Sequence, residues 1–274
     1  MKHMLLGLAF AAALSHAQPK FEVASIKQNN SEDMRSGFGM KIMPGGRVSL
    51  KNLPLFILIA TAYDVPFQST RFSGGPDWIR TERYDIEAAA PEGAIPAGAT
   101  TRERDAIVHR MLQSLFEDRF KLVMQRETKD QPIYAVVAGR KGAKLEQSGI
   151  QEKDCTGEDN GNVPVCHSFR GGQGRGLHSE AATLEDAALF VSNWSDRPVV
   201  DQTGIKTLFK FDTPGWVPMR VMPGTGTAPT SPEGLDDPLR PSLFGIFDHM
   251  GLKLEARKGP IETFHIQSIE RLKE

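Results

Sequence analysis

The chain has 274 residues, of which 39% are hydrophobic and 24% are charged, so it contains enough apolar material for a packed core. Its 33 lysines and arginines nearly balance its 34 aspartates and glutamates, and there is no local run of basic residues. Because a protein that binds a polyanion needs a basic surface, we expect no nucleic-acid partner.

The N-terminal segment has the three parts of a secretory signal. Lys2 and His3 precede the apolar run Met4–Leu14, and Ser15-His16-Ala17 places small residues where a signal peptidase reads them. We therefore expect residues 1–17 to be a signal peptide. The apolar run is about half as long as the roughly 20 residues that cross a bilayer. The expected product is a soluble extracytoplasmic protein, periplasmic or secreted, with no stable membrane anchor after cleavage.

Four helices are predicted from apolar side chains at helical spacing and from signals at the helix ends. Pro54 suits the start of the first helix, because its missing N–H needs no partner there. Thr100 and Glu103 have the spacing of a capping box at the start of the second helix. Gly251 suits a left-handed cap at the end of the fourth. The predicted helices begin after Pro54, Thr100, Thr183 and Ser242.

The order helix, strand, proline-containing turn, strand is predicted twice along the chain. The two turns are placed at Gln131-Pro132 and Gly259-Pro260. The offset of 132 residues from Phe120 to Leu252, where the strand of each copy begins, also takes Leu55 to Ala187, each within a predicted helix. This indicates an internal repeat, with chance similarity of two αβ units as the alternative.

Strands joined by short hairpin links favour an α+β fold. We expect two related αβ units with largely antiparallel sheets and helices packed on one face. The predicted order is signal peptide 1–17, first αβ unit 18–140, disulfide-bearing linker 141–180 and second αβ unit 181–274. A long Pro/Gly-rich loop at 214–241 is either a binding flap or a solvated insertion.

The sequence contains two cysteines, Cys155 and Cys166, inside a polar loop. In an oxidising compartment a disulfide is the default. Closing this short loop removes roughly 3 kcal/mol of unfolded-chain entropy in the simplest model. A metal site that includes His167 and His178 is the alternative, but the spacing matches no zinc-ligand pattern. We expect a structural disulfide, and neither a metal nor a cofactor.

No motif of a known catalytic class is present, since the sequence lacks G-x-S-x-G, H-E-x-x-H, S-x-x-K and a phosphate-binding glycine loop. Clustered carboxylates and single histidines are interpreted as solvated or packed side chains; they are Asp64, Asp77, Asp85, Glu87, His109, His249 and His265. Glycines allow a sharp turn, and a tryptophan beside them can anchor a ligand. Core packing is the favoured interpretation of Gly74, Gly75 and Trp78, and a ligand surface formed by these three residues is the alternative.

Ordered sequence blocks run through the whole mature chain: Phe21–Lys27, Pro44–Arg47, Leu53–Tyr63, Gly74–Trp78, Tyr84–Ile86, Asp118–Leu122, Arg126–Thr128, Arg197–Gly204 and Gly251–Leu254. Together they resemble the Solibacter-type paralogous family, a group of secreted proteins of unknown function from Acidobacteria. That family has no assigned catalytic residues. A similar domain is attached to BlaR-like membrane metallopeptidase sensors, so the resemblance implies, by analogy, a sensing or binding role outside the cytoplasm.

Two classes of function follow from these observations. The favoured prediction is a noncatalytic extracytoplasmic binding or sensing module, with an unknown ligand or an envelope protein as its partner. The alternative is a hydrolase that acts on an envelope or extracellular polymer. Such an enzyme would need polar groups from distant residues to meet in a cleft between the halves.

Overall fold

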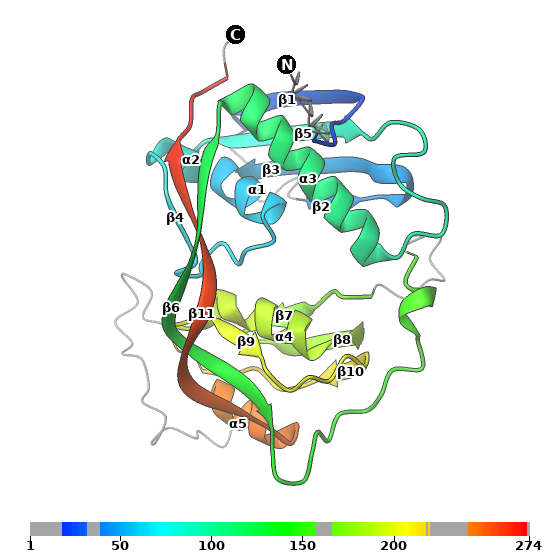
Figure 1. Ribbon diagram of the computed structural model, residues 1–274, viewed down its shortest axis with the longest axis vertical. Coiled ribbons are helices and arrows are strands. Elements are labelled where there is room, and N and C mark those ends of the chain that lie inside the picture. The colour runs from blue at the N-terminus through cyan, green and yellow to red at the C-terminus, as the bar shows by residue number, and fades with distance from the viewer. Residues whose placement is uncertain (1–17, 32–38, 157–165, 218, 220–240, 273–274) are drawn as a thin grey trace, which may run out of the picture.

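The computed structural model describes residues 18–31, 39–156, 166–217, 219 and 241–272, which form an α+β fold (Figure 1). The predicted signal peptide 1–17 and most of the predicted loop 214–241 lie outside these ranges. The described part contains five α-helices and 11 strands. The strands form three sheets whose strand pairs are mostly antiparallel, which confirms the predicted fold class. None of the helices described is long and apolar enough to span a membrane.

The helices are α1 Leu55–Ala62, α2 Trp78–Thr81, α3 Thr101–Phe120, α4 Leu184–Val191 and α5 Leu243–His249. The strands are β1 Val23–Asn29, β2 Gly39–Ile42, β3 Arg47–Pro54, β4 Phe72–Gly74, β5 Arg83–Ala89, β6 Val123–Ala138, β7 Arg170–Gly172, β8 Gly176–Ala182, β9 Val199–Asp201, β10 Phe209–Asp212 and β11 Leu252–Ser268.

The four predicted helices begin at the predicted places. Pro54 directly precedes α1, and α3, α4 and α5 are capped by the side chains of Thr100, Thr183 and Ser242. Both threonines form the capping boxes that their spacing predicts, each with an acidic residue three positions later. The short helix α2 was not predicted.

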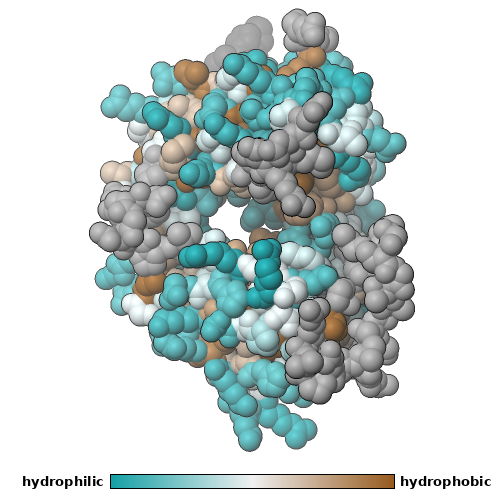
Figure 2. Space-filling model, turned by 180° about the vertical axis from the view of Figure 1, so that it is seen from behind, coloured by the Kyte–Doolittle hydropathy of each residue, from teal (hydrophilic) through white to brown (hydrophobic). Residues whose placement is uncertain are grey.

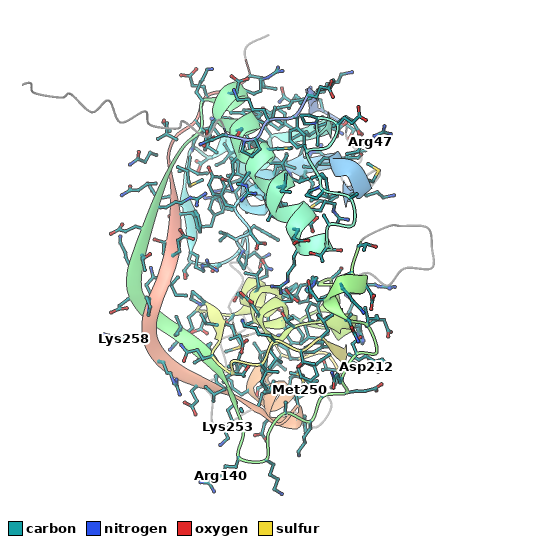
Figure 3. All side chains as sticks on the ribbon, turned by 45° about the vertical axis from the view of Figure 1, so that its right-hand side comes forward. Arg47, Arg140, Asp212, Met250, Lys253 and Lys258 are labelled. Atoms are coloured by element: carbon teal, nitrogen blue, oxygen red, sulfur yellow. A yellow bond between two sulfur atoms is a disulfide. The ribbon has the colours of Figure 1, made fainter. Side chains whose placement is uncertain are left out.

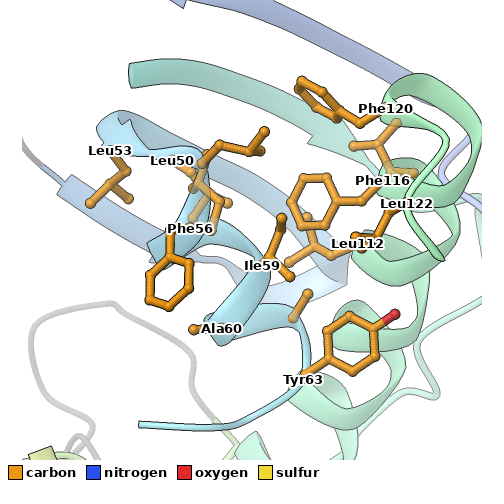
Figure 4. Packing of buried hydrophobic residues seen from close by; sticks show 14 of the residues in the cluster. Leu50, Leu53, Phe56, Ile59, Ala60, Tyr63, Leu112, Phe116, Phe120 and Leu122 are labelled. Carbon is orange, nitrogen blue, oxygen red and sulfur yellow. The ribbon is translucent and has the colours of Figure 1, made fainter. Parts of the chain in front are cut away.

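The first half of the molecule, at the top of Figure 1, is the sheet β1-β5-β3-β2 with α1 and α3 packed on one face. Its core is a continuous cluster of apolar side chains. Figure 4 shows Leu50 of β3 and Ile59 of α1 facing Leu112 and Phe116 of α3. All four side chains are fully shielded from solvent. This packing stabilises the half by burial of apolar surface.

The second half, at the bottom of Figure 1, contains the sheet β10-β8-β7 together with α4 and α5. It has its own hydrophobic cluster, which includes Leu184 and Val191 of α4 and Ile246 and Phe247 of α5. The two halves thus have separate cores.

A long ribbon of two antiparallel strands, β6 and β11, joins the halves along one side of the molecule (Figure 1). The two predicted proline-containing turns are therefore wrong. Gln131 of β6 and Gly259 of β11 instead face each other in the middle of the ribbon. Each strand runs through the position at which a hairpin was expected.

The ribbon tolerates both prolines because of the direction in which their missing N–H groups would point. The N–H of Tyr134 bonds outward to Pro198, and the N–H of Phe264 bonds outward to Arg71. Since N–H direction alternates along a strand, Pro132 and Pro260 occupy equivalent outward positions. No hydrogen bond between β6 and β11 is lost, so proline does not interrupt the ribbon.

Each half is completed by the end of a ribbon strand. In the first half, β4 pairs in parallel with Phe264–Ile266 of β11, whereas in the second half β9 pairs in parallel with Tyr134–Val136 of β6. Phe264 and Ile266 belong to the hydrophobic cluster of the first half, and Tyr134 and Val136 belong to that of the second. The chain therefore passes between the halves along both strands, and the unit boundaries at 140 and 181 stay a prediction.

Candidate functional site

A cavity of about 750 Å³, here called the cleft, lies between the two halves and is lined by residues of both. Helix α3 of the first half and α4 of the second contribute to its walls, and β6 and β11 line it on the side of the ribbon. Figure 2 shows an opening between the halves from the back of the molecule. A pocket of this volume is within the usual range for small-molecule sites.

Helix α3 presents two different faces. One face carries apolar residues such as Val108, Leu112 and Phe116 into the core of the first half. The other face lines the cleft with residues at the same helical spacing, namely Arg102, Asp105, Ala106, His109, Arg110 and Gln113. The polar face of an amphipathic helix therefore forms one wall of the cleft.

At one end of the cleft, the start of α3 is bonded to the start of α4. Nη2 of Arg102 donates to Oδ1 of Asp186 over 2.7 Å and to Oγ1 of Thr183 over 3.0 Å. A looser ion pair of 3.7 Å joins Arg102 to Glu185. These contacts bridge the two halves on the side opposite the ribbon.

His167 completes this connection, and its side chain is only 7% exposed. Nδ1 lies 2.7 Å from Oδ2 of Asp186, and Nε2 lies 3.0 Å from Oε1 of Glu152. Because an ionised carboxylate only accepts hydrogen bonds, both ring nitrogens must carry hydrogen to satisfy both carboxylates, and Nε of Arg102, 3.2 Å from Nδ1, then has no acceptor there. The geometry therefore fits a positively charged imidazolium. We call Arg102, Glu152, His167 and Asp186 the clasp.

The pKa values within the clasp follow from these contacts. Burial disfavours the charged form of His167, but the hydrogen bond and charge of Asp186 outweigh it and raise the pKa of His167. Glu152 adds to this effect, whereas Arg102, with Nε 3.2 Å from Nδ1, opposes it. Burial also disfavours ionised Asp186, yet bonds from His167 and from the Thr183 backbone lower the pKa of that carboxyl. The clasp is thus a mutually stabilised set of charges.

The ribbon side of the cleft holds Arg126. Its Nη2 donates to Oε1 of Gln113 over 3.1 Å, and Nε2 of Gln113 donates to the carbonyl of Ala62 over 2.7 Å. The guanidinium carbon lies 5.2 Å from the ring centroid of Tyr63 and 5.4 Å from that of Phe264. Arg126 is therefore positioned by an amide and by two aromatic rings.

Tyr63 also lines this end of the cleft, and its hydroxyl is able to donate a hydrogen bond. Burial, reinforced by Glu117 and opposed by Arg126, raises the pKa of Tyr63 to about 12. The phenol therefore stays protonated at neutral pH. Within the described residues, its hydroxyl makes no hydrogen bond.

On the wall formed by the second half, two aromatic rings meet at the cleft. Phe169 and Phe190 stack with centroids 5.1 Å apart and an interplanar angle of 28°. Both are half-buried, and both line the cleft. We call this pair the aromatic platform.

The predicted ligand surface lies in the first half, in and just after β4. It consists of Gly74, Gly75 and Trp78. A Cβ on Gly74 would stand 2.6 Å from the carbonyl oxygen of Ile266, and both glycines have positive φ, at 85° and 74°. The close approach of β11 accounts for Gly74, whereas a Cβ on Gly75 would stand 2.5 Å from Cδ1 of Ile79. Trp78 is half-buried with Arg271 4.8 Å above its ring. These residues are not among those that line the cleft, and their binding role stays a prediction.

The predicted disulfide between Cys155 and Cys166 is present, with Cα atoms 5.6 Å apart. Both residues are buried in a small cluster with Ala181 and Leu208, although the sequence suggested an unburied polar loop. Part of that loop, residues 157–165, lies outside the described residues.

The disulfide argues against the predicted alternative, a metal site at the two cysteines. A zinc ion binds cysteine as a thiolate, and a disulfide sulfur is not a thiolate. Glu152, Cys155 and His167 do lie within 4.8 Å of one another, but the sulfur of Cys155 is bonded to Cys166. His178 is engaged elsewhere, with Nδ1 2.8 Å from Oδ1 of Asp212.

One pairing of nucleophile and base is present that the sequence did not indicate. Oγ of Ser73 lies 3.2 Å from Nδ1 of His265 across the parallel strands β4 and β11. Both side chains are exposed, and neither lines the cleft. Among the residues described, no carboxylate orients His265, so the pair lacks the third group of a catalytic triad.

The clustered carboxylates and other histidines have individual environments. Asp85 accepts hydrogen bonds from Asn29 and from the backbone of Asn52, and Glu87 pairs with Ser49 and Lys51. These two acids thus bind neighbouring strands. Asp64 and His109 line the cleft, and His249 lines a second cavity of about 1160 Å³ on the second half.

The comparisons with known proteins reach one family. A family model described as "Protein of unknown function (DUF3738)" matches residues 57–269, which include the cleft walls formed by α3, α4 and the ribbon. Neither the curated proteins nor the solved structures give a significant match.

Proposed function

The chain belongs to the DUF3738 family of unknown function, and from its cleft we propose that it is a noncatalytic binding or sensing module that works outside the cytoplasm. The observation that carries this proposal is the cleft itself, which is lined by both halves and contains donors that have no partner among the described residues, beside aromatic surface. The Solibacter-type resemblance and the domain attached to BlaR-like sensors support the same role by analogy.

The way in which the halves are joined supports a sensing role. The two cores are separate, and the ribbon and the clasp connect them on opposite sides of the cleft. A ligand that touches both walls binds best to one separation of the halves, so its binding shifts the molecule toward that arrangement. A partner protein in the cell envelope that binds one arrangement of the halves better than the other would respond to this shift.

An extracytoplasmic location is supported by the disulfide, since such bonds persist in oxidising compartments. The expected mature protein begins at Gln18. Intact-mass measurement of the protein from a periplasmic or culture fraction tests this directly. A chain that retains Met1 would contradict the proposal of export by a cleaved signal.

Ligand binding is tested with a variant that fills the cleft. Ala106 is exposed and lies on the cleft face of α3, so Ala106→Trp should block the cleft without entering the core. Lys253→Trp is the matched control, because Lys253 lies toward the lower end of the ribbon, away from the cleft (Figure 3).

The mature chain and both variants are incubated with the small-molecule fraction of the source cells and recovered by gel filtration. Released compounds are then identified by mass spectrometry. We expect the wild type and Lys253→Trp to retain a compound that Ala106→Trp does not. Equal retention by all three proteins, or retention by none, would overturn the cleft as the binding site.

A further inference from the structure

The charges around the cleft are unequally paired. Several of its acidic residues have basic neighbours: Asp105 pairs with Arg104, Glu185 and Asp186 pair with Arg102, and Asp64 and Glu262, which also line the cleft, interact with the charge of Arg71. By contrast, three basic residues on the wall of the first half, His109, Arg110 and Arg126, form no ion pair within the described part of the chain. Arg110 and Arg126 therefore have N–H groups that no carboxylate within the described residues occupies, so an anionic group can bind them directly.

Arg126 is the best-positioned of these bases. Within the part of the chain that the structure describes, one of its five N–H donors is used, by Gln113, and the guanidinium lies beside the rings of Tyr63 and Phe264. Gln113 is itself anchored on the carbonyl of Ala62. A planar guanidinium held in this way can bind both oxygens of a carboxylate with its free N–H groups.

Other donors stand at the same wall. The hydroxyl of Tyr63 is protonated and free of partners among the described residues. Arg110 lies one helical turn before Gln113 on the cleft face of α3. An anionic group at Arg126 would thus meet further donors.

The opposite wall has a different character. The aromatic platform of Phe169 and Phe190, with Leu189 beside it, offers apolar surface to the same cleft. The acidic residues of this wall, Glu185 and Asp186, already pair with Arg102, so they do not require a cationic ligand. A ligand that fills the cleft needs an anionic end and an apolar or aromatic end.

Building on the proposed binding function, we infer that the cleft takes a small amphipathic carboxylate. Its carboxylate binds Arg126, with Tyr63 as a second donor, and its apolar body packs against the aromatic platform. A phosphate ester shares the oxyanion chemistry but carries close to two negative charges at neutral pH. The single guanidinium fork fits the carboxylate better.

The inference is tested by titration calorimetry on the mature chain with four probes: 3-phenylpropionate, 3-phenyl-1-propanol, propionate and phenyl phosphate. We expect 3-phenylpropionate to bind most tightly, with the neutral alcohol about 10-fold weaker or more, as for loss of a charge-assisted hydrogen bond. Tighter binding of phenyl phosphate would replace the carboxylate with a phosphate ester and overturn the inference.

Two variants separate the ends of the ligand. Arg126→Gln should weaken 3-phenylpropionate about 10-fold or more and leave the alcohol unchanged, whereas Arg119→Gln, an exposed arginine of the same half, should change neither. Phe190→Leu should weaken both ring-bearing probes and not propionate. Thermal unfolding of each variant checks that it is folded.

The outcomes distinguish this inference from the proposed function. If Arg126→Gln binds 3-phenylpropionate as the wild type does, or if no probe binds the wild type, the inference is wrong. The proposed function then still stands provided that Ala106→Trp loses the compound that the wild type retains. If that difference is also missing, both are wrong.

Discussion

Nδ1 of His167 and Oδ2 of Asp186 lie 2.7 Å apart, and this contact joins the segment after the disulfide to the first turn of α4. Arg102 of α3 binds the other oxygen of the same carboxylate. Asp186 thus collects contacts from the linker and from the first half of the molecule. The stability of the clasp should depend on the charges of both His167 and Asp186.

The pH dependence of unfolding is the first prediction. Because the folded protein raises the pKa of His167, its contribution is complete below about pH 6.5 and is lost as pH rises through the folded pKa. Because the pKa of Asp186 is lowered, its contribution is complete above about pH 4 and is lost as pH falls through the folded pKa. The clasp should therefore be strongest between about pH 4 and pH 6.5.

Urea unfolding at pH 5.5 and pH 8.5 measures this effect. We expect His167→Gln to lower the free energy of unfolding by on the order of 1–3 kcal/mol at pH 5.5 and by less at pH 8.5. His249→Gln, a change at an exposed histidine, serves as the control and should behave as the wild type does. An equal loss at both pH values would show that the imidazolium does not stabilise the clasp.

The prediction from sequence succeeded where the signal is local. Thr100 and Thr183 cap the helices that follow them, because a capping box depends on residues three positions apart. The two cysteines were also paired correctly, since they have no other sulfur partner.

The ribbon and the cleft could not be predicted in the same way. Pro132 and Pro260 have the local appearance of turns, and their strands are continuous only because each pairs with a distant partner. The polar face of α3 can be read from the spacing of Arg102, His109 and Gln113. What faces it, namely the start of α4, is decided by tertiary packing.

The role of Gly74 gives the second prediction. If the glycine is required by the approach of β11, Gly74→Ala should destabilise the fold by roughly 2–4 kcal/mol, from positive φ together with a clash at Ile266. Gly93 has a similar φ of 73° and open space around it, so Gly93→Ala isolates the backbone strain at about 1–2 kcal/mol. Equal losses in thermal or urea unfolding would exclude a packing role and favour the predicted ligand surface.

The disulfide gives the third prediction. Cys155 and Cys166 are buried, and the carbonyl of Cys155 accepts a hydrogen bond of 2.8 Å from the hydroxyl of Thr101 at the start of α3. Replacing both cysteines with alanine should cost about 3 kcal/mol, chiefly by freeing the unfolded chain. The loss should appear as a lower urea midpoint.

Thiol labelling in urea identifies the bond chemically. Without reductant the denatured protein should bind no thiol reagent, and after reduction it should bind two equivalents. Denaturation comes first because burial alone would protect free thiols in the folded protein. Two equivalents without reductant would mean that the bond is absent.

The last prediction concerns whether the two predicted units fold separately. The core of the first half includes Phe264 and Ile266 of β11, which are 3% and 2% exposed and come from the far end of the chain. The core of the second half includes Tyr134 and Val136 of β6. Each half therefore needs a strand end that a cut within residues 141–150 would leave in the other fragment.

We expect fragment 18–145 alone to lack a cooperative thermal transition, and fragments 18–145 and 146–274 to form a 1:1 complex that unfolds cooperatively. Circular dichroism melts and size-exclusion chromatography measure both properties. Phe264→Ala in the second fragment should weaken the complex, because it removes a buried ring from the core of the first half. Lys258→Ala, a change at an exposed residue in the middle of the ribbon, should not. Cooperative unfolding of 18–145 by itself would instead support independent units with the predicted boundaries.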